Sequence, residues 1–250
     1  EGPWVKKPGQ DLLVQCISGF ANLTGNKNDG PVPVGAAISD IITGSHLVQG
    51  ILASLLKRGK TNKGALVEVS LLESTLDFQF EVITTYLNDG NKLPQRAEQG
   101  GAHAYLGAPY GVYKTNDGYL SLAMGSLLKL AKVLKCKELE TFKDSKSWFK
   151  QRNEIMDILR RFLIRKNTQD LLDLLEPEGI WCSDVFDYKK LLNHKAYTLL
   201  GMDQELDLLS GEKVHTTRCP IRLNDQRIYT SKPAPRVGQH TALITKEFNL

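Results

Sequence analysis

Apolar residues recur along this chain with helical spacing in some segments and with strand-like alternation in others. Residues 11–20 predict a short helix. From Ile41 onward the apolar positions share one helical face, which predicts a long helix with one continuous buried face, formed by Val48, Ile51, Leu52, Leu55 and Leu56. Residues 66–69 alternate like a strand, and residues 71–86 return to helical spacing.

The second half of the chain mixes both periods. Residues 110–123 predict a β-hairpin around Asn116-Asp117-Gly118, which is a strong turn sequence. Helices are predicted over 127–134, 149–165 and 168–175, a strand over 179–185, an extended stretch over 214–223 and a short helix over 241–247. This order of elements indicates a mixed α/β protein.

Residues 88–103 are rich in Gly, Asn and charged side chains, which is typical of a linker. We therefore expect a change of domain near residues 90–105. A second change is expected near residues 195–210.

Composition excludes several classes of protein. The 250 residues carry 32 Lys and Arg against 28 Asp and Glu, and a net charge of +4 is too weak to indicate nucleic-acid binding. The most apolar stretch contains Asp40 and His46, which would be costly to bury in lipid, so no membrane segment is expected. The four cysteines lack metal-ligand spacing, so we expect no metal site, free thiols and a cytoplasmic location.

Asp40 is the candidate for chemistry. It follows Gly35-Ala36-Ala37-Ile38-Ser39 at the start of the long predicted helix. Unpaired N–H groups at a helix start stabilise a carboxylate, or an oxyanion formed on it, and the small residues leave room for a substrate. An aspartate at this place is also a common helix cap, and the pattern alone leaves both roles open.

Besides the segment around Asp40, several short motifs occur in a fixed order along almost the whole chain. They are Gln15-x-x-Ser18-Gly19-Phe20, Asp40-x-x-Thr43-Gly44, Val69-Ser70-Leu71-Leu72-Glu73, Pro109-Tyr110-Gly111-Val112-Tyr113 and Ala234-Pro235-Arg236-x-Gly238. In this order they resemble the class III CoA-transferases, the group that includes formyl-CoA and carnitine-linked CoA-transferases.

The resemblance implies the C-terminal portion of that α/β fold. We expect a large-domain segment over 1–90, a linker over 91–105, a small α/β domain over 106–200 and a C-terminal segment over 201–250 that returns to the large domain. The family's N-terminal Rossmann-like half has no counterpart here, so we expect a fragment, a truncated product or a separately encoded half. Family members form intertwined homodimers, which implies the same assembly.

The resemblance also implies a mechanism. Asp40 would be the nucleophile, and CoA would pass through an aspartyl anhydride and an aspartyl-CoA thioester to a small carboxylic acid. Acyl-CoA is then a substrate, and no tightly bound cofactor is expected. Gly100-Gly101 matches a glycine-containing cover of the active site, although a flexible linker remains open.

Other residues have two interpretations each. Lys6 and Lys7 lie near the place of a CoA-contacting lysine, while Gln15 is either a contact for the acyl group or a structural amide. Arg58 and Lys60 are either phosphate partners or helix-end cations. His46 is interpreted as a packed histidine, and Cys16 has no base positioned beside it.

Two alternatives to transfer remain. An acyl-CoA racemase shares this fold, but its catalytic His is expected near residues 13–18, where this chain has Val14-Gln15-Cys16. The other alternative is a non-catalytic truncated subunit that requires a partner chain.

Overall fold

The computed structural model describes residues 2–250 of the chain. Contacts divide the described chain into two compact units, one ending at Val185 and the other formed by Phe186–Leu250. The mixed α/β fold is confirmed. The finer division at residues 90, 105 and 200 stays a prediction.

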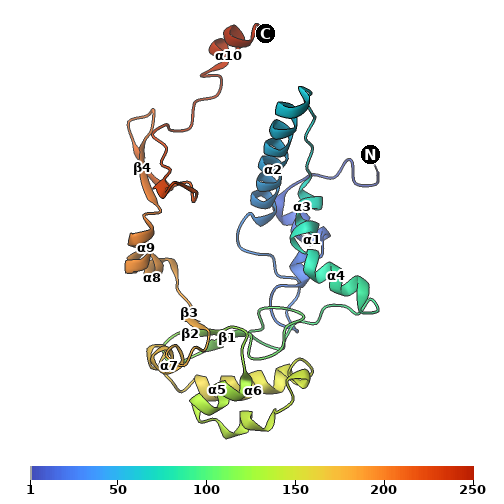
Figure 1. Cartoon of the computed structure of the whole chain (residues 1–250), viewed down its shortest axis with the longest axis vertical. Helices are drawn as coiled ribbons and strands as arrows, with labels where there is room; N and C mark the ends of the chain where they lie inside the picture. The colour runs from blue at the N-terminus through green and yellow to red at the C-terminus, as the bar shows by residue number, and fades with distance from the viewer. Residues whose placement is uncertain (1) are drawn as a thin grey trace. The chain divides into compact units, whose positions relative to one another are not determined.

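The first half of the larger unit is helical. Its elements are α1 (Asp11–Ile17), the short 3-10 helix η1 (Phe20–Asn22), α2 (Ile38–Thr61), α3 (Leu71–Phe78) and α4 (Phe80–Asn88). Helix α2 packs against α1 and α3, and Figure 1 shows α2 and α3 side by side. The small side chains of Ser39, Ser74 and Thr75 are buried in these two helices, which lets their backbones approach closely.

Two local predictions in this half are wrong. The segment over 66–69 is not a strand, because it has no partner strand in the described chain. It runs back beside α2, where the Val67 side chain fills the space that a Cβ on Gly50 would occupy. The helix predicted over 71–86 is interrupted at Gln79, which joins α3 to α4 with a ψ of 13°. The start of α3 is a capping box, in which Ser70 Oγ accepts from the Glu73 N–H at 3.1 Å.

The predicted buried face of α2 is exposed. Val48 is 56% exposed, Leu52 56% and Leu56 73%. The helix itself is confirmed, but α1 and α3 cover only part of its surface. Helical spacing of apolar residues therefore predicted the helix correctly, but the burial of its apolar face was predicted wrongly.

The second half of the larger unit is a small α/β layer structure. Strands β1 (Gly111–Lys114), β2 (Tyr119–Leu122) and β3 (Cys182–Asp184) form an antiparallel sheet in that order, with Tyr113 opposite Leu120. The hairpin prediction is confirmed. The accompanying helices are α5 (Leu127–Leu134), η2 (Lys137–Thr141), η3 (Ser145–Ser147), α6 (Arg152–Leu163) and α7 (Thr168–Leu175).

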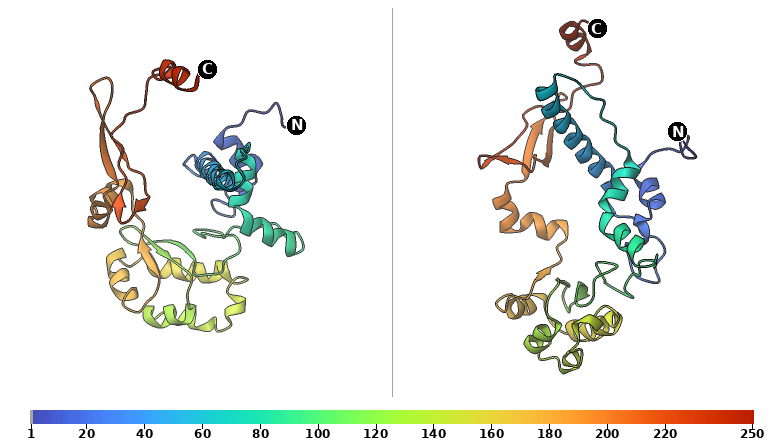
Figure 2. Two further views of the ribbon diagram at one scale, coloured as in Figure 1. Left: turned by 45° about the horizontal axis from the view of Figure 1, so that its top comes forward. Right: turned by 45° about the vertical axis from the view of Figure 1, so that its right-hand side comes forward.

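This layer holds the hydrophobic core of the unit. Apolar side chains from β2, α5, α6 and α7 are fully buried together, among them Leu120, Leu127, Ile155, Leu159, Leu163 and Leu175. Both views in Figure 2 place α5 and α6 side by side beneath the sheet. Most of the buried apolar side chains of the larger unit therefore belong to this layer.

The smaller unit has little core of its own. It contains α8 (Tyr188–Asn193), α9 (Lys195–Leu200), β4 (Asp203–Asp207), β5 (Lys213–Thr217), β6 (Arg222–Leu223), β7 (Gln226–Arg227) and α10 (Thr241–Phe248). Strands β4 and β5 pair antiparallel, as do β6 and β7. Within this described unit Arg218 is the only buried side chain; its guanidinium donates to the carbonyl oxygens of Leu200 and Gly201 at the end of α9.

Candidate functional site

Asp40 lies in the first turn of α2, as the sequence predicts. It is the third residue of the helix and is exposed. Its side chain has no hydrogen-bond or ion-pair partner between residues 2 and 250. The N-cap residue Ala37 has no side-chain group that could accept a hydrogen bond from the first-turn N–H groups.

The backbone before Asp40 is held by a buried carboxylate from another helix. Oδ1 of Asp11, in α1, accepts a hydrogen bond from the Ser39 N–H at 2.8 Å. Asp11 is 8% exposed and acts as a cap for α2 across a gap of 28 residues. The residue next to Asp40 is therefore fixed by tertiary contact rather than by a local cap.

Gln15 completes this support. Its Nε2 donates to Asp11 Oδ2 at 2.7 Å, and its Oε1 accepts from the Val34 N–H at 2.8 Å. Gln15 is 1% exposed, so both ends of the amide are engaged inside the protein. This geometry favours the structural interpretation of Gln15; contact with an acyl group stays a prediction.

The first-turn amides of α2 are unequally occupied. The Ile38 N–H donates to Ala36 O at 2.8 Å, the Ser39 N–H to Asp11, and the Ile41 N–H to Ala37 O at 3.1 Å. The Asp40 N–H has no acceptor within the described chain. One backbone donor beside the candidate carboxylate is therefore available.

Gly100 and Gly101 form a tight turn beside β1. Gly100 has a φ of +69°, and a Cβ there would clash with the carbonyl oxygen of Val112. A Cβ on Gly101 would lie 2.5 Å from the Ala97 Cβ. The Val112 N–H donates to Gly100 O at 2.8 Å, so the turn adds a short bridge to the sheet edge. These close contacts leave no room for a side chain at either position, so both glycines are required by the structure.

The structure does not bring all predicted site residues together. No hydrogen bond or ion pair within the described chain joins Asp40 to Lys7, Gly100 or Gly101. Lys7 is exposed, with its ammonium 5.7 Å from the centre of the Trp4 ring. Contacts of Lys7 and the glycines with CoA stay predictions.

The remaining candidates are placed as follows. Lys6, Arg58 and Lys60 are exposed, and the last two lie in the final turn of α2, where cations complement the helix dipole. His46 is half-buried, with Nε2 3.3 Å from Asp77 Oδ2, in agreement with a packed histidine. Cys16 is an exposed free thiol.

Three of the hollows in the larger unit are lined in part by residues 93–104. One of about 840 Å³ lies between η1, α4 and residues 93–96; a second of about 460 Å³ is lined by Phe20, Phe78 and residues 101–104. A third of about 520 Å³ lies against the β1–β3 sheet and contains Trp181. Asp40 is not among the residues that line these three.

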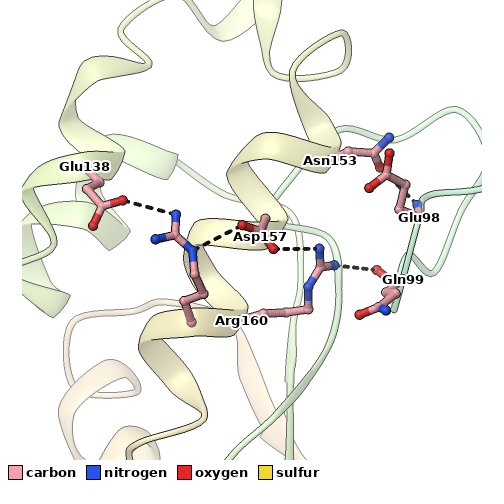
Figure 3. A network of polar contacts seen from close by, with 7 residues as sticks. Glu98, Gln99, Glu138, Asn153, Asp157 and Arg160 are labelled. Carbon is pink, nitrogen blue, oxygen red and sulfur yellow. Dashed lines mark hydrogen bonds and ion pairs between the residues drawn. The ribbon is translucent and has the colours of Figure 1, made fainter.

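Helix α6 attaches the glycine turn to the core. Asn153 Oδ1 accepts from the Glu98 N–H at 3.0 Å, and Arg160 donates to the Gln99 carbonyl oxygen at 3.2 Å. Figure 3 shows both contacts reaching from one side of α6, while Asp157 receives hydrogen bonds from Arg160 and from its neighbour Arg161. The segment interpreted as a linker is therefore fastened at its tip.

Sequence reasoning missed Asp11 and Arg152. Asp11 lies four residues before Gln15, so the two share a helix face, and this spacing was the available signal. Arg152 had no signal, because its partners are backbone oxygens far away in sequence.

No group of three His, Cys, Asp or Glu side chains within residues 2–250 is arranged around a possible metal position. No helix in this part of the chain combines the length and apolarity needed to span a bilayer.

Comparison with known proteins gives a consistent result. The sequence model described as CoA-transferase family III matches residues 1–241. Human succinyl-CoA:glutarate CoA-transferase is 28% identical over 98% of this chain and 57% of its own length. The succinate–glutarate CoA-transferase of Agrobacterium fabrum is 26% identical over 98% of this chain and 62% of its own length. The chain thus spans about three fifths of these relatives.

A solved structure supports the fold. The crystal structure of a CaiB/BaiF family protein from Brucella suis matches with a TM-score of 0.76 and 25% identity. The match covers 99% of this chain and 65% of that chain.

Proposed function

This chain belongs to CoA-transferase family III, and on that premise we propose that it transfers CoA from an acyl-CoA donor to a carboxylic acid, with Asp40 as the nucleophile. The observation that carries the proposal is the state of Asp40. Its carboxylate is exposed and without a partner in the described chain, at the start of a helix whose backbone is braced by Asp11. A nucleophilic carboxylate requires this accessibility.

The proposed reaction begins at the donor thioester. A carboxylate oxygen of Asp40 bonds to the thioester carbonyl carbon, the C–S bond breaks, and CoA leaves as a thiolate. The thiolate then bonds to the Asp40 carbonyl carbon of the anhydride, and the C–O bond to that carbon breaks. The donor acid leaves as a carboxylate, and an aspartyl-CoA thioester remains.

The acceptor reverses these steps. Its carboxylate attacks the aspartyl-CoA thioester, CoA leaves as a thiolate, and the thiolate attacks the acceptor's carbonyl carbon. The Asp40 carboxylate is restored and the new acyl-CoA leaves. Negative charge develops on oxygen in each addition, and we expect the unoccupied Asp40 N–H to donate to it.

The class of acid is proposed from the relatives. The names of the human and Agrobacterium proteins pair succinyl-CoA or succinate with glutarate. We therefore propose dicarboxylic acids as substrates. Succinyl-CoA with glutarate is the first pair to test.

The test replaces the nucleophile and keeps its shape. Asp40→Asn should abolish CoA transfer and also the CoA adduct on the Asp40 peptide, detected by mass spectrometry after incubation with donor. The matched control is Asp170→Asn, which removes an exposed carboxylate from the same third position of α7. Asp170→Asn should transfer at the wild-type rate; full transfer by Asp40→Asn would exclude the mechanism.

Racemisation is not proposed. It needs a general base on each side of an acidic carbon, and α1 contains no histidine. The nearest candidate in α2, His46, is paired with Asp77.

An intertwined homodimer and a separate N-terminal half remain predictions. The exposed apolar face of α2 supports association, because apolar surface of that extent gains free energy when it is covered.

A further inference from the structure

A single buried arginine ties together both ends of residues 95–106, here called the 95–106 loop. Arg152, the first residue of α6, is 5% exposed. Its Nη2 donates to the Gln95 carbonyl oxygen at 2.8 Å, at the start of the loop. Its Nη1 donates at 3.1 Å to Ala104 O near the loop's end, with longer contacts to the oxygens of His103 and Leu106.

The charge of Arg152 is not used in an ion pair. No Asp or Glu of the described chain pairs with it, and burial lowers the pKa of the guanidinium. A buried cation costs free energy unless hydrogen bonds replace its hydration, and here carbonyl oxygens of one loop accept from Nη1 and Nη2, while Nε is buried without a partner in the described chain. Lysine lacks the planar fork that reaches both ends of the loop.

The tip of the loop is held by the same helix. Asn153 accepts from the Glu98 N–H, and Arg160 donates to Gln99 O (Figure 3). From the loop after α1, the Gly100 N–H donates to Asn26 Oδ1 at 2.9 Å. The glycine turn is thus held by polar contacts from two separate segments of the chain.

The loop also forms walls of the three hollows described above. Gln95 and Arg96 line the largest, residues 101–104 line the second, and Ala102 lines the third. Any movement of the loop changes the shape of all three. By fixing the loop, Arg152 therefore also fixes the walls of these hollows.

We propose that Arg152 is a positioning residue for the transfer reaction, which it serves by holding the 95–106 loop and its glycine turn in place. This inference rests on the proposed function and on the cover role that the resemblance implies for the glycine turn, which would exclude water from the intermediates. A loosened loop would admit water to the aspartyl-CoA thioester. Water oxygen then bonds to the carbonyl carbon, the C–S bond breaks, CoA leaves as the thiol with one proton, the other goes to solvent, and the Asp40 carboxylate is restored.

The experiment compares three variants by two measurements. Arg152→Lys keeps the charge and loses the fork, Arg160→Met loses the contact with Gln99, and Arg161→Met is the matched control. Arg161 lies next to Arg160 and also pairs with Asp157, but it makes no hydrogen bond to the loop. The measurements are amide hydrogen exchange of residues 97–104 and the ratio of CoA hydrolysed to CoA transferred.

The inference expects a graded result. In Arg152→Lys, exchange in the loop should accelerate about tenfold or more, and the hydrolysis-to-transfer ratio should rise severalfold. Arg160→Met should change both in the same direction by less, and Arg161→Met should match the wild type.

Three results would overturn the inference. The first is wild-type exchange in Arg152→Lys, and the second is an equal effect of Arg160→Met and Arg161→Met. The third is faster exchange with an unchanged hydrolysis ratio, which would make Arg152 purely structural. If the wild type transfers no CoA, the proposed function fails and the catalytic part of the inference fails with it, while exchange still decides whether Arg152 holds the loop.

Discussion

Asp11 Oδ1 lies 2.8 Å from the Ser39 backbone nitrogen and accepts its hydrogen bond, so a residue of α1 holds the peptide that leads into Asp40. Ser39 itself is fully buried, while Asp40 next to it is exposed. The candidate nucleophile is thus exposed, while the preceding peptide is held in place by the hydrogen bond to Asp11. Preorganisation of this kind lowers the cost of positioning a reacting group.

Removing the Asp11 carboxylate should destabilise the fold. Asp11→Ala leaves the Ser39 N–H without its acceptor and Gln15 Nε2 with only its longer contacts to Val34 O and Ala36 O, and we expect a loss of about 1.5–3 kcal/mol in the free energy of unfolding. Urea unfolding monitored by circular dichroism measures the loss. Asp170→Ala, an exposed helical aspartate, should lie within about 0.5 kcal/mol of the wild type; an equal cost for the two variants would contradict the capping role of Asp11.

The glycine turn should not tolerate a methyl group. Gly100→Ala places a Cβ against the Val112 carbonyl oxygen at a positive φ, and we expect a cost of about 1–3 kcal/mol. The control is Gly59→Ala, for which we expect an increase rather than a decrease in the free energy of unfolding. Gly59 lies in α2 with no atom within 4 Å of its Cβ position, so alanine should stabilise that helix by about 0.5–1 kcal/mol. Thermal unfolding of the two variants decides whether the turn needs glycine.

Acid should weaken the turn of the β1–β2 hairpin through Asp117. The N–H of Thr168, and then its hydroxyl, donate to Asp117 Oδ1 at 2.8 and 2.9 Å, and these hydrogen bonds hold the pKa of that carboxyl below its ordinary value of 3.8. A carboxyl whose pKa is lower in the folded state stabilises the fold above its unfolded pKa. That contribution is lost as the pH falls through the folded pKa.

The corresponding measurement is the free energy of unfolding between about pH 5 and pH 2. Asp117→Asn should show a shallower loss on acidification than the wild type. The control is Asp170→Asn, which removes a charge from α7, the helix of Thr168, and makes none of these hydrogen bonds. Identical acid profiles for the wild type and Asp117→Asn would exclude a role of Asp117.

Two leucines distinguish a covered face from an open one. Leu159 is fully buried in the core, and Leu159→Ala should cost about 2–5 kcal/mol. Leu56 is 73% exposed on α2, and Leu56→Ala should cost less than about 0.5 kcal/mol if the face is open in solution. A cost of several kcal/mol at Leu56 would show that this face is covered, and sedimentation of the same sample would show whether a second chain covers it.

Local patterns predicted the elements that carry their own signals. The hairpin formed because Asn116-Asp117-Gly118 favours a turn between alternating strands, and α5 and α7 have the bounds that their apolar spacing predicts. The helices α8 and α9 and strand β4 were missed, because these short elements contain too few turns or alternations to show a period. The position of Asp40 at a helix start was likewise visible in the sequence.

The sequence by itself indicated Asp40 as the candidate for chemistry and predicted the long helix α2, the β1–β2 hairpin, α5 and α7, because these depend on side-chain chemistry and on contacts within a few residues. Tertiary structure alone decided what supports the site. Asp11 reaches Ser39, and Arg152 reaches Gln95 and Ala104, across 28, 57 and 48 residues. Their partners are backbone N–H and C=O groups, which every residue other than proline possesses, so no pattern of side chains marks them in advance.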